Sequence, residues 1–201
     1  QGTFLDIDFG TYPFVTSSSA TAGGACIGSG IPPVMIDKIV GVAKAYTTRV
    51  GEGPFPTEFS PGFDKFIRDK GHEFGATTGR PRRCGWFDSV MVKEAVLLNG
   101  ISELAIMKLD ILDGLKTVKI CTAYKYKGKN FKEFPRDFSV LKNAHPVYRE
   151  LPGWAKIVDG PKHYKDLPQN ARNYLSCIQD ILNTRISMVS IGSARQDTVF
   201  V

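Results

Sequence analysis

Residues 75–83, Gly-Ala-Thr-Thr-Gly-Arg-Pro-Arg-Arg, combine two glycines, two threonines and three arginines in nine positions. An arginine guanidinium presents a planar fork of donors that matches a carboxylate or a phosphate with two hydrogen bonds. Threonine hydroxyls and the backbone amides that glycine leaves accessible can complete a ring of donors. The segment therefore predicts an anion-binding loop. The alternative is a solvated basic turn between two helices, because arginines are common on protein surfaces.

A second unusual segment, residues 16–31, holds four glycines and six hydroxyl side chains. Such a composition is typical of a flexible linker. The interleaved alanine, cysteine and isoleucine residues favour instead an ordered loop that presents amides and hydroxyls to a ligand.

Several aspartate, histidine and tryptophan residues could serve in catalysis or metal binding, but no partner in the sequence points to a particular reaction. Asp6 and Asp8 alternate along one short segment, as a metal-binding or acid–base pair could, although we favour a role in pinning the neighbouring loop. No acidic or cysteine partner stands at catalytic spacing from any histidine. We interpret the following residues as surface, structural or packing residues: His72, His145, His163, Trp86 and Trp154.

Length and composition indicate a globular protein with one core. The 201 residues are 42% hydrophobic, which suffices for a single domain. The formal net charge of +6 fits nucleic-acid binding and equally fits an enzyme for acidic or phosphorylated small molecules. The basic residues are dispersed apart from the cluster at 80–83, and no RNA-binding motif accompanies them, so we expect no nucleic-acid partner.

Cysteine spacing and hydropathy bear on the compartment. The four cysteines lie far apart and form no zinc-binding pattern, so we interpret them as reduced thiols of a cytoplasmic protein: Cys26, Cys84, Cys121 and Cys177. No apolar stretch approaches the roughly 20 residues that cross a bilayer, and we expect no membrane association. The chain starts at Gln1 without a methionine, and we expect a longer parent sequence.

Apolar periodicity predicts the elements that must position these residues. We expect an α/β fold with a mixed, largely parallel sheet, flanking helices and a small antiparallel hairpin. The loops after Asp110 and Ile191 would then lie at the carboxyl ends of strands, where ligands gather in such sheets. Strands are predicted at 4–8, 42–50, 104–110 and 186–191, helices at 34–39, 63–70, 88–98 and 168–182, a hairpin over 115–134, and irregular structure over 135–167.

Seven short strings, taken in order, resemble the carboxyl-terminal half of adenylosuccinate synthetase. They include Glu73-Phe-Gly-Ala-Thr-Thr-Gly-Arg80 and Lys108-Leu-Asp110. The resemblance runs from the first residue to the last and implies one domain over 1–201. The strings occupy residues 1–8, 10–18, 44–51, 53–58, 73–80, 108–110 and 151–154.

The resemblance implies a function and ligands. The family joins L-aspartate to IMP with GTP and Mg²⁺, through a 6-phosphoryl-IMP intermediate, in purine nucleotide synthesis. Catalysis of this kind depends mainly on positioning and on positive charge around the phosphates. The family is typically a cytoplasmic homodimer. By resemblance, IMP is bound by Gln1, Thr16, Val50 and Arg80, and aspartate by Ala76, Thr77, Thr78, Gly79, Arg80, Pro81 and Arg82.

The resemblance also implies a guanine pocket at Asp110. A carboxylate can accept from both N1–H and the 2-amino group of guanine, which adenine cannot offer. Without the resemblance, Asp110 could be an ordinary aspartate that ends a strand. Ser193 and Ala194 depart from the family pattern in the segment that would form the second wall of this pocket. The implied GTP-binding residues are Arg82, Lys108, Leu109, Asp110, Ser190, Ile191 and Gly192.

The motifs expected of the family's amino-terminal half do not occur in the sequence. There is no G-x-x-x-x-G-K-[ST] string and no Gly-Asp-Glu-Gly string. We therefore expect the general base, the general acid and the Mg²⁺ ligands to lie outside this chain, and the chain alone to be inactive. The competing hypothesis is a non-catalytic module that binds a nucleotide or RNA through the basic loop.

Overall fold

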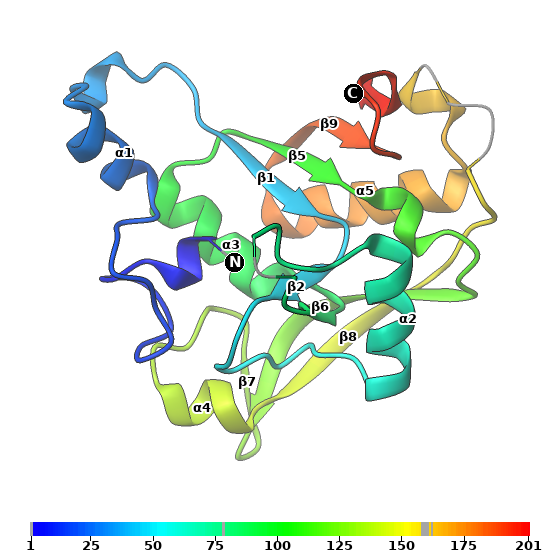
Figure 1. Ribbon diagram of the computed structural model, residues 1–201. Coiled ribbons are helices and arrows are strands. Elements are labelled where there is room, and N and C mark those ends of the chain that lie inside the picture. Colours follow the sequence, from blue (N-terminus) through cyan, green and yellow to red (C-terminus); the bar gives the residue numbers. More distant parts are fainter. Residues whose placement is uncertain (1, 78, 158–160, 162) are drawn as a thin grey trace.

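A four-stranded sheet organises the computed structural model, which describes residues 2–77, 79–157, 161 and 163–201. Its strand order is β1-β5-β9-β10 (Figure 1). The first three strands are parallel, and β10 is antiparallel to β9. Because parallel strands end at the same edge, the residues that follow β1, β5 and β9 come together there. The bounds are β1 (Val40–Lys44), β5 (Glu103–Met107), β9 (Arg185–Ser190) and β10 (Thr198–Phe200).

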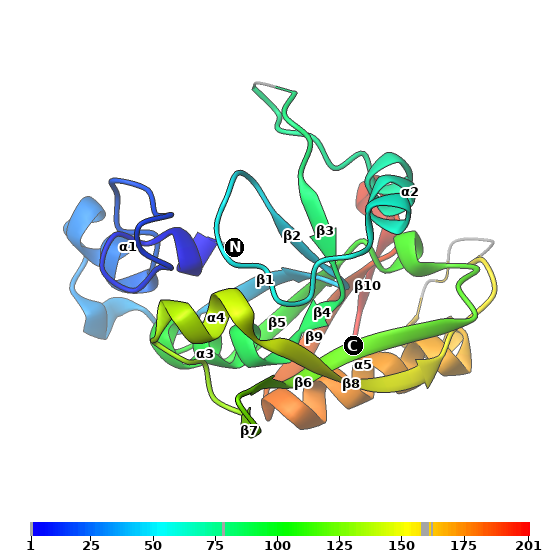
Figure 2. The ribbon, with the colours of Figure 1, turned by 90° about the horizontal axis from the view of Figure 1, so that it is seen from below.

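Two further sheets complete the β structure. The long strand β6 pairs in parallel with β4 and antiparallel with β7 and β8. A separate antiparallel pair, β2 and β3, lies at the base of a loop whose described residues, 75–77 and 79–82, project from the body between α2 (Pro61–Gly71) and β3 (Figure 2). The bounds are β2 (Thr47–Arg49), β3 (Arg83–Gly85), β4 (Phe87–Asp88), β6 (Thr117–Tyr126), β7 (Lys129–Phe131) and β8 (His145–Pro152).

Helices α3 and α5 pack against these sheets. The Asp88 carboxylate accepts from the Met91 amide at 3.1 Å and caps α3, which ends at Gly100 with a φ of 62°. Helix α5 contacts β8 and β9, and its buried Tyr174 donates to the Ala45 carbonyl at 2.7 Å. The loop after β1 is thereby tied to the core. The bounds are α1 (Ala22–Ser29), α2 (Pro61–Gly71), α3 (Ser89–Asn99), α4 (Phe138–Asn143) and α5 (Gln169–Leu182).

The apolar side chains form two buried clusters. The larger one joins the central sheet to α5, and the aromatic ring of Trp154 packs against Tyr174 within it. The smaller one surrounds Phe4, Tyr124 and Phe134 beside α3 and α4. The predicted packing role of Trp154 is confirmed, and the four cysteines are free thiols.

The mixed α/β class is confirmed, but several local predictions were wrong. Residues 4–8 do not form a strand: a 3-10 turn, Gly2–Leu5, occupies this region because the Asp6 side chain binds nearby backbone amides. The helix predicted at 34–39 shrinks to a 3-10 turn at Pro33–Met35, and Gly41 belongs to β1.

The remaining differences come from tertiary contacts. The strand expected over 42–50 is divided between β1 and β2 by the buried Ala45 and Tyr46. The segment 16–31 contains helix α1. The stretch 135–167, expected to be irregular, includes α4 and β8, and β8 is stabilised by a long antiparallel pairing with β6. No helix within the described ranges combines the length and the apolar character that a membrane span requires.

Candidate functional site

The fully buried Glu73 carboxylate lies at the centre of a cationic cluster, which we define as Lys44, Arg82 and Lys108. One of its oxygens, Oε1, accepts from the Tyr46 hydroxyl at 2.5 Å and from Lys108 Nζ at 2.9 Å. The other, Oε2, accepts from Lys44 Nζ and Arg82 Nη1, each at 2.7 Å. Three positive charges therefore surround one negative charge.

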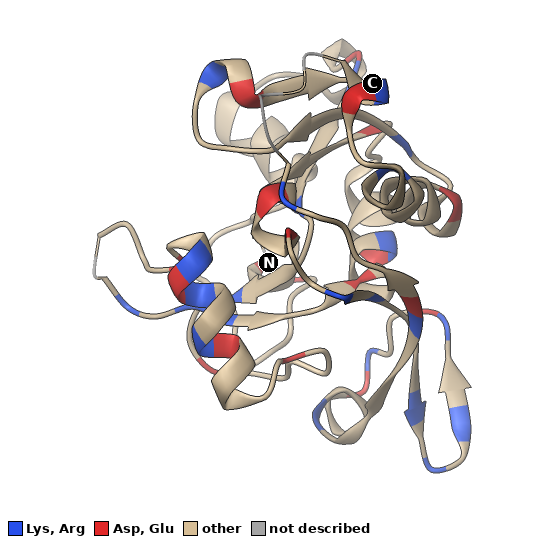
Figure 3. Ribbon diagram, turned by 90° about the vertical axis from the view of Figure 1, so that its right-hand side faces the viewer, with Lys and Arg blue, Asp and Glu red and all other residues tan. Residues whose placement is uncertain are grey.

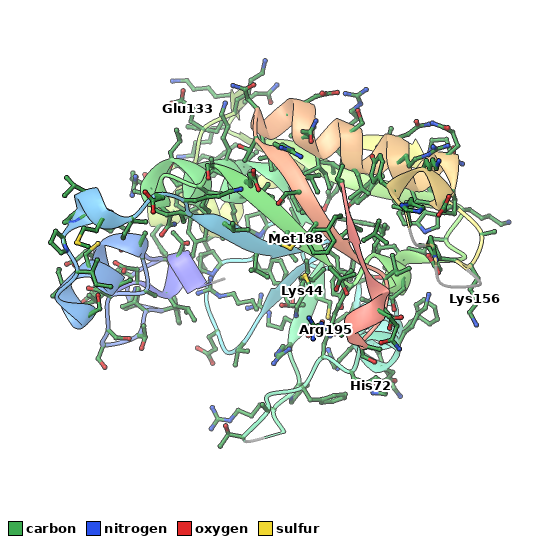
Figure 4. All side chains as sticks on the ribbon, turned by 90° about the horizontal axis from the view of Figure 1, so that it is seen from above. Lys44, His72, Glu133, Lys156, Met188 and Arg195 are labelled. Atoms are coloured by element: carbon green, nitrogen blue, oxygen red, sulfur yellow. The ribbon has the colours of Figure 1, made fainter. Side chains whose placement is uncertain are left out.

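The fold explains how distant residues meet in this cluster. Lys44 ends β1 and Lys108 follows β5, so both lie at the carboxyl edge of neighbouring parallel strands. Figure 4 shows Lys44 at the end of the β1 arrow, in the centre of the molecule. Glu73 and Arg82 stand on the two sides of the projecting segment, where the Arg82 amide donates to the Glu73 carbonyl at 2.9 Å.

Electrostatics keeps Glu73 ionised. Burial alone would raise the pKa of this carboxyl, but hydrogen bonds from Lys44, Tyr46, Lys108 and Arg82 lower it to about 2. Burial lowers the pKa of the Lys44 ammonium, and the Glu73 charge opposes that effect. The cluster thus carries a net positive charge of two when both lysines are protonated.

A cavity of about 780 Å³ adjoins the cationic cluster. Lys44, Arg82 and Lys108 all line it, together with Val50 and the apolar side chains of β1 and α3. Arg49, only 3% exposed, lines it too. A cavity with a basic wall and an apolar wall suits a ligand that has an anionic group and a flat apolar part.

The buried Arg49 guanidinium ties two loops to β2. It donates to Thr11 Oγ1 and to the Glu52 carbonyl, each at 2.9 Å, and to the Phe14 carbonyl at 3.4 Å. No carboxylate within the described ranges pairs with it. Burial lowers its pKa to about 10, so it remains charged at neutral pH.

The predicted aspartate loop is a narrow, solvent-exposed turn. The Gly75 amide donates to the Arg80 carbonyl at 2.8 Å, and Gly79, with a φ of 62°, donates to the Gly75 carbonyl at 2.9 Å. The side chains of Ala76, Thr77, Arg80 and Pro81 are exposed, and no described residue pairs with the Arg80 guanidinium. Basic segments mark both this loop and the adjacent α2 in Figure 3. Thr78 lies outside the described residues.

Asp110 has the properties expected of a ligand-binding carboxylate. Its Oδ1 is buried, and no group in the described part of the chain donates a hydrogen bond to it. Burial raises its pKa, although Lys70 and Lys108 oppose the shift. A buried polar atom without a partner costs about 1–3 kcal/mol, so an external donor would be stabilising there. Leu109, by contrast, is buried in the core, so only its backbone could reach a ligand.

The segment after β9 is held by hydrogen bonds within itself. Ser190 Oγ donates to the Gly192 carbonyl at 2.8 Å, and the Ile191 amide donates to the Asp197 carbonyl at 2.9 Å. The Asp197 carboxylate accepts from the Ala194 amide at 2.8 Å. A Cβ at Gly192 would lie 2.3 Å from Asp197 Oδ2, so this close approach requires glycine.

The residues proposed for IMP come from separate segments of the chain. The Thr16 amide donates to the Leu5 carbonyl at 2.7 Å. The Asp6 carboxylate accepts from the Ala20 amide at 2.6 Å, which confirms that Asp6 pins this loop. Val50 follows β2 at the cavity wall. Gln1 lies outside the described residues.

The cavity therefore unites only part of the predicted site. Val50, Arg82 and Lys108 line it, whereas Thr16, the exposed loop residues, Asp110 and the segment 190–192 do not. Sequence reasoning missed four residues as site groups: Lys44, Tyr46, Arg49 and Glu73. Three of them lie within the string Lys44-Ala-Tyr-Thr-Thr-Arg49, which could have drawn attention as polar residues in a strand-forming segment.

Comparisons with known proteins identify the family. The adenylosuccinate synthetase family model matches residues 1–199. The adenylosuccinate synthetases of Halothermothrix orenii and Carboxydothermus hydrogenoformans are 52% and 54% identical to the chain over 199 residues. These matches cover 99% of the chain but 46% and 47% of the relatives.

A solved structure agrees with the sequence matches. The fully ligated adenylosuccinate synthetase of Plasmodium falciparum superposes with a TM-score of 0.95 at 38% identity, covering 99% of this chain and 48% of that one. The chain thus spans about half the length of the proteins that it matches. It belongs to the adenylosuccinate synthetase family.

Proposed function

We propose that this chain supplies IMP-, aspartate- and GTP-binding groups to an adenylosuccinate synthetase, a ligase that joins L-aspartate to IMP with hydrolysis of GTP to GDP and phosphate. The observation that carries the proposal is the buried, unpartnered Oδ1 of Asp110. It stands two residues after Lys108, at the carboxyl edge of a parallel sheet, where α/β proteins bind nucleotides.

Different residues of the predicted site would bind the guanine base, the aspartate substrate and the phosphates. Asp110 would accept from N1–H and the 2-amino group of guanine, with the segment 190–192 as the second wall of the pocket. The exposed fork of Arg80, with Thr77, Thr78 and the neighbouring backbone, would bind the carboxylates of aspartate. Arg82 and Lys108 would place positive charge near the phosphates, where phosphoryl transfer needs it.

The IMP contacts would come from several separate segments of the chain. Thr16 would donate to the phosphate, Val50 would contact the ribose, and Gln1 would contact the hypoxanthine edge. Arg80 would also reach the ribose. The proposed sequence of steps is phosphorylation of the 6-oxygen of IMP, followed by displacement of phosphate by the amine of aspartate.

Mg²⁺ would be required by this chemistry but does not fit this chain alone. The described residues contain no group of three or more histidine, cysteine, aspartate or glutamate side chains able to hold a metal ion. We therefore propose that its ligands, the general base and the general acid come from outside these 201 residues, and that residues 1–201 form a single domain portion of the enzyme. The proposed assembly is a cytoplasmic homodimer.

Nucleobase preference tests the proposal directly. The chain is titrated calorimetrically with GTP, ITP, which lacks the 2-amino group, and ATP, which also lacks the N1–H donor. We expect the affinity to fall by about tenfold or more from GTP to ATP, with ITP between them, because each lost donor removes one hydrogen bond to the Asp110 carboxylate. Asp110→Asn should remove the preference, and Asp69→Asn, an exposed site on α2, should retain it. Equal affinity for all three nucleotides would contradict the proposal.

A further inference from the structure

Glu73 joins three segments that carry separate parts of the site. Its carboxylate binds Lys44 at the end of β1, Arg82 at the base of the projecting loop and Lys108 after β5. These partners are 29, 9 and 35 residues away in sequence. Because the Glu73 side chain is fully buried and both oxygens already accept two hydrogen bonds, it is not itself a ligand contact.

We propose that Glu73 is the positioning residue of the site: it fixes Arg82 and Lys108 relative to each other, and thereby links the aspartate loop to the guanine side. The inference rests on the proposed function, because that function gives Arg82 and Lys108 their ligands.

The chemistry of the partners supports this role. Long lysine and arginine side chains lose rotamer entropy when they are fixed, and a ligand that fixes them bears this cost. Glu73 fixes them before a ligand arrives, which favours binding through preorganisation. Only Glu73, among the described residues, accepts from the Arg82 guanidinium, so the remaining donors of that fork are available to a ligand.

The arrangement of the three cationic side chains also requires an anion where the Glu73 carboxylate lies. Lys44 and Arg82 share a single carboxylate oxygen, and Lys108 binds the other. Without the carboxylate, three like charges would repel one another and move apart into the cavity. The net charge of the cluster stays positive with Glu73 present, so an anionic ligand is still attracted.

Whether Glu73→Gln strengthens or weakens GTP binding distinguishes a positioning role of Glu73 from a purely electrostatic one. The substitution removes the negative charge at the centre of the cationic cluster, so electrostatics alone predicts tighter binding of GTP. Positioning predicts weaker binding, by about tenfold or more, because Arg82 and Lys108 lose their shared partner. Glu73→Asp sharpens the test, since it keeps the charge but withdraws the carboxylate: positioning predicts weaker binding, and electrostatics alone predicts no change.

The matched control is Glu58→Gln. Glu58 pairs with the neighbouring arginine, Arg83, at 2.5 Å, but neither residue lines the cavity of the cationic cluster. This variant loses the same charge and should change GTP affinity by less than about twofold. Tighter GTP binding in Glu73→Gln together with unchanged binding in Glu73→Asp would overturn the proposal.

A ligand-free measurement keeps the inference separate from the proposed function. In ¹H–¹⁵N spectra that detect lysine ammonium groups, we expect protected signals from Lys44 and Lys108 in the parent chain and in Glu58→Gln, and their loss in Glu73→Asp. Persistence of both signals in Glu73→Asp would overturn the positioning role. Failure of the parent chain to bind GTP would contradict the proposed function, while these spectra would still decide the role of Glu73.

Discussion

The Glu73 carboxylate accepts a hydrogen bond from the Lys108 ammonium at 2.9 Å, across 35 residues of sequence. Lys108 adopts a left-handed backbone conformation, with a φ of 59°, and its ammonium also donates to the Gly71 carbonyl at 2.6 Å. A non-glycine residue in this conformation is uncommon and is retained where its surroundings fix it. This contact connects the edge of the central sheet to the base of the projecting loop.

The pKa of Glu73 predicts an acid sensitivity of folding. Its pKa is lowered from 4.5 to about 2, so its contribution to the unfolding free energy is complete above pH 4.5 and is lost as the pH falls toward 2. Between pH 5 and pH 3 we expect the parent chain to lose about 2 kcal/mol relative to Glu73→Gln. Urea unfolding of both proteins at the two pH values measures this difference. A constant difference would show that Glu73 titrates normally.

The two loop arginines should differ in their effect on stability. Arg80 is exposed and no described residue pairs with it, so Arg80→Ala should change the unfolding free energy by less than about 0.5 kcal/mol. Arg82→Ala removes a donor from buried Glu73 and should cost about 1–2 kcal/mol. If both bind ligands as proposed, calorimetry should show weakened binding of L-aspartate in Arg80→Ala and weakened binding of GTP in Arg82→Ala. A larger loss of unfolding free energy in Arg80→Ala than in Arg82→Ala would refute the assignment of a structural role to Arg82 alone.

The contrast between these arginines shows what could be learned from the sequence. The string 75–83 predicted an anion-binding loop from its composition alone, and the structure shows exposed donors there. The sequence could not separate Arg80 from Arg82, because their difference comes from Glu73, and both side chains have the same local chemistry. The contacts of Glu73 depend on which strands lie next to each other, which no local pattern specifies.

Asp88 predicts a second pH dependence, with the opposite sign. Burial raises the pKa of this carboxyl from 3.8 to about 6, against hydrogen bonds from Tyr124 and the start of α3. The unfolding free energy of the chain therefore falls as the pH rises from about 4 through 6, because the unfolded state releases the Asp88 proton at a lower pH than the folded state does. Asp88→Asn should remove this loss, so the parent chain should lose about 2–3 kcal/mol relative to the variant over that range. If the difference in unfolding free energy between the parent chain and Asp88→Asn were the same at pH 4 and at pH 7, the raised pKa of Asp88 would be contradicted.

Asp6 should hold the segment that carries Thr16. Its carboxylate accepts from the amides of Asp8, Phe9 and Ala20 at 2.6–3.0 Å. Asp6→Ala leaves these amides without an acceptor and should cost about 1–3 kcal/mol. Hydrogen exchange at the Ala20 amide should accelerate strongly, and it should stay slow in the exposed neighbour variant Asp8→Ala. Unchanged exchange in Asp6→Ala would show that the loop is held by other contacts.

The elements with the strongest local signals were predictable, whereas those built by pairing were not. The capped helix α3 and the amphipathic helix α5 lie close to their predicted positions because their ends and apolar faces are encoded locally. Strand β8 was missed because its stability comes from β6, and its prolines stand near its two ends, Pro146 and Pro152. Likewise, Asp110 was identified through its resemblance to a family motif, and its unpartnered oxygen became visible only in the fold.

A crystal structure of this chain with a bound guanine nucleotide would show whether Asp110 binds the guanine base. We expect both carboxylate oxygens of Asp110 to lie within about 3 Å of N1 and the 2-amino nitrogen, with the segment 190–192 against the base. A base bound elsewhere, with Asp110 Oδ1 still unpartnered, would contradict this expectation.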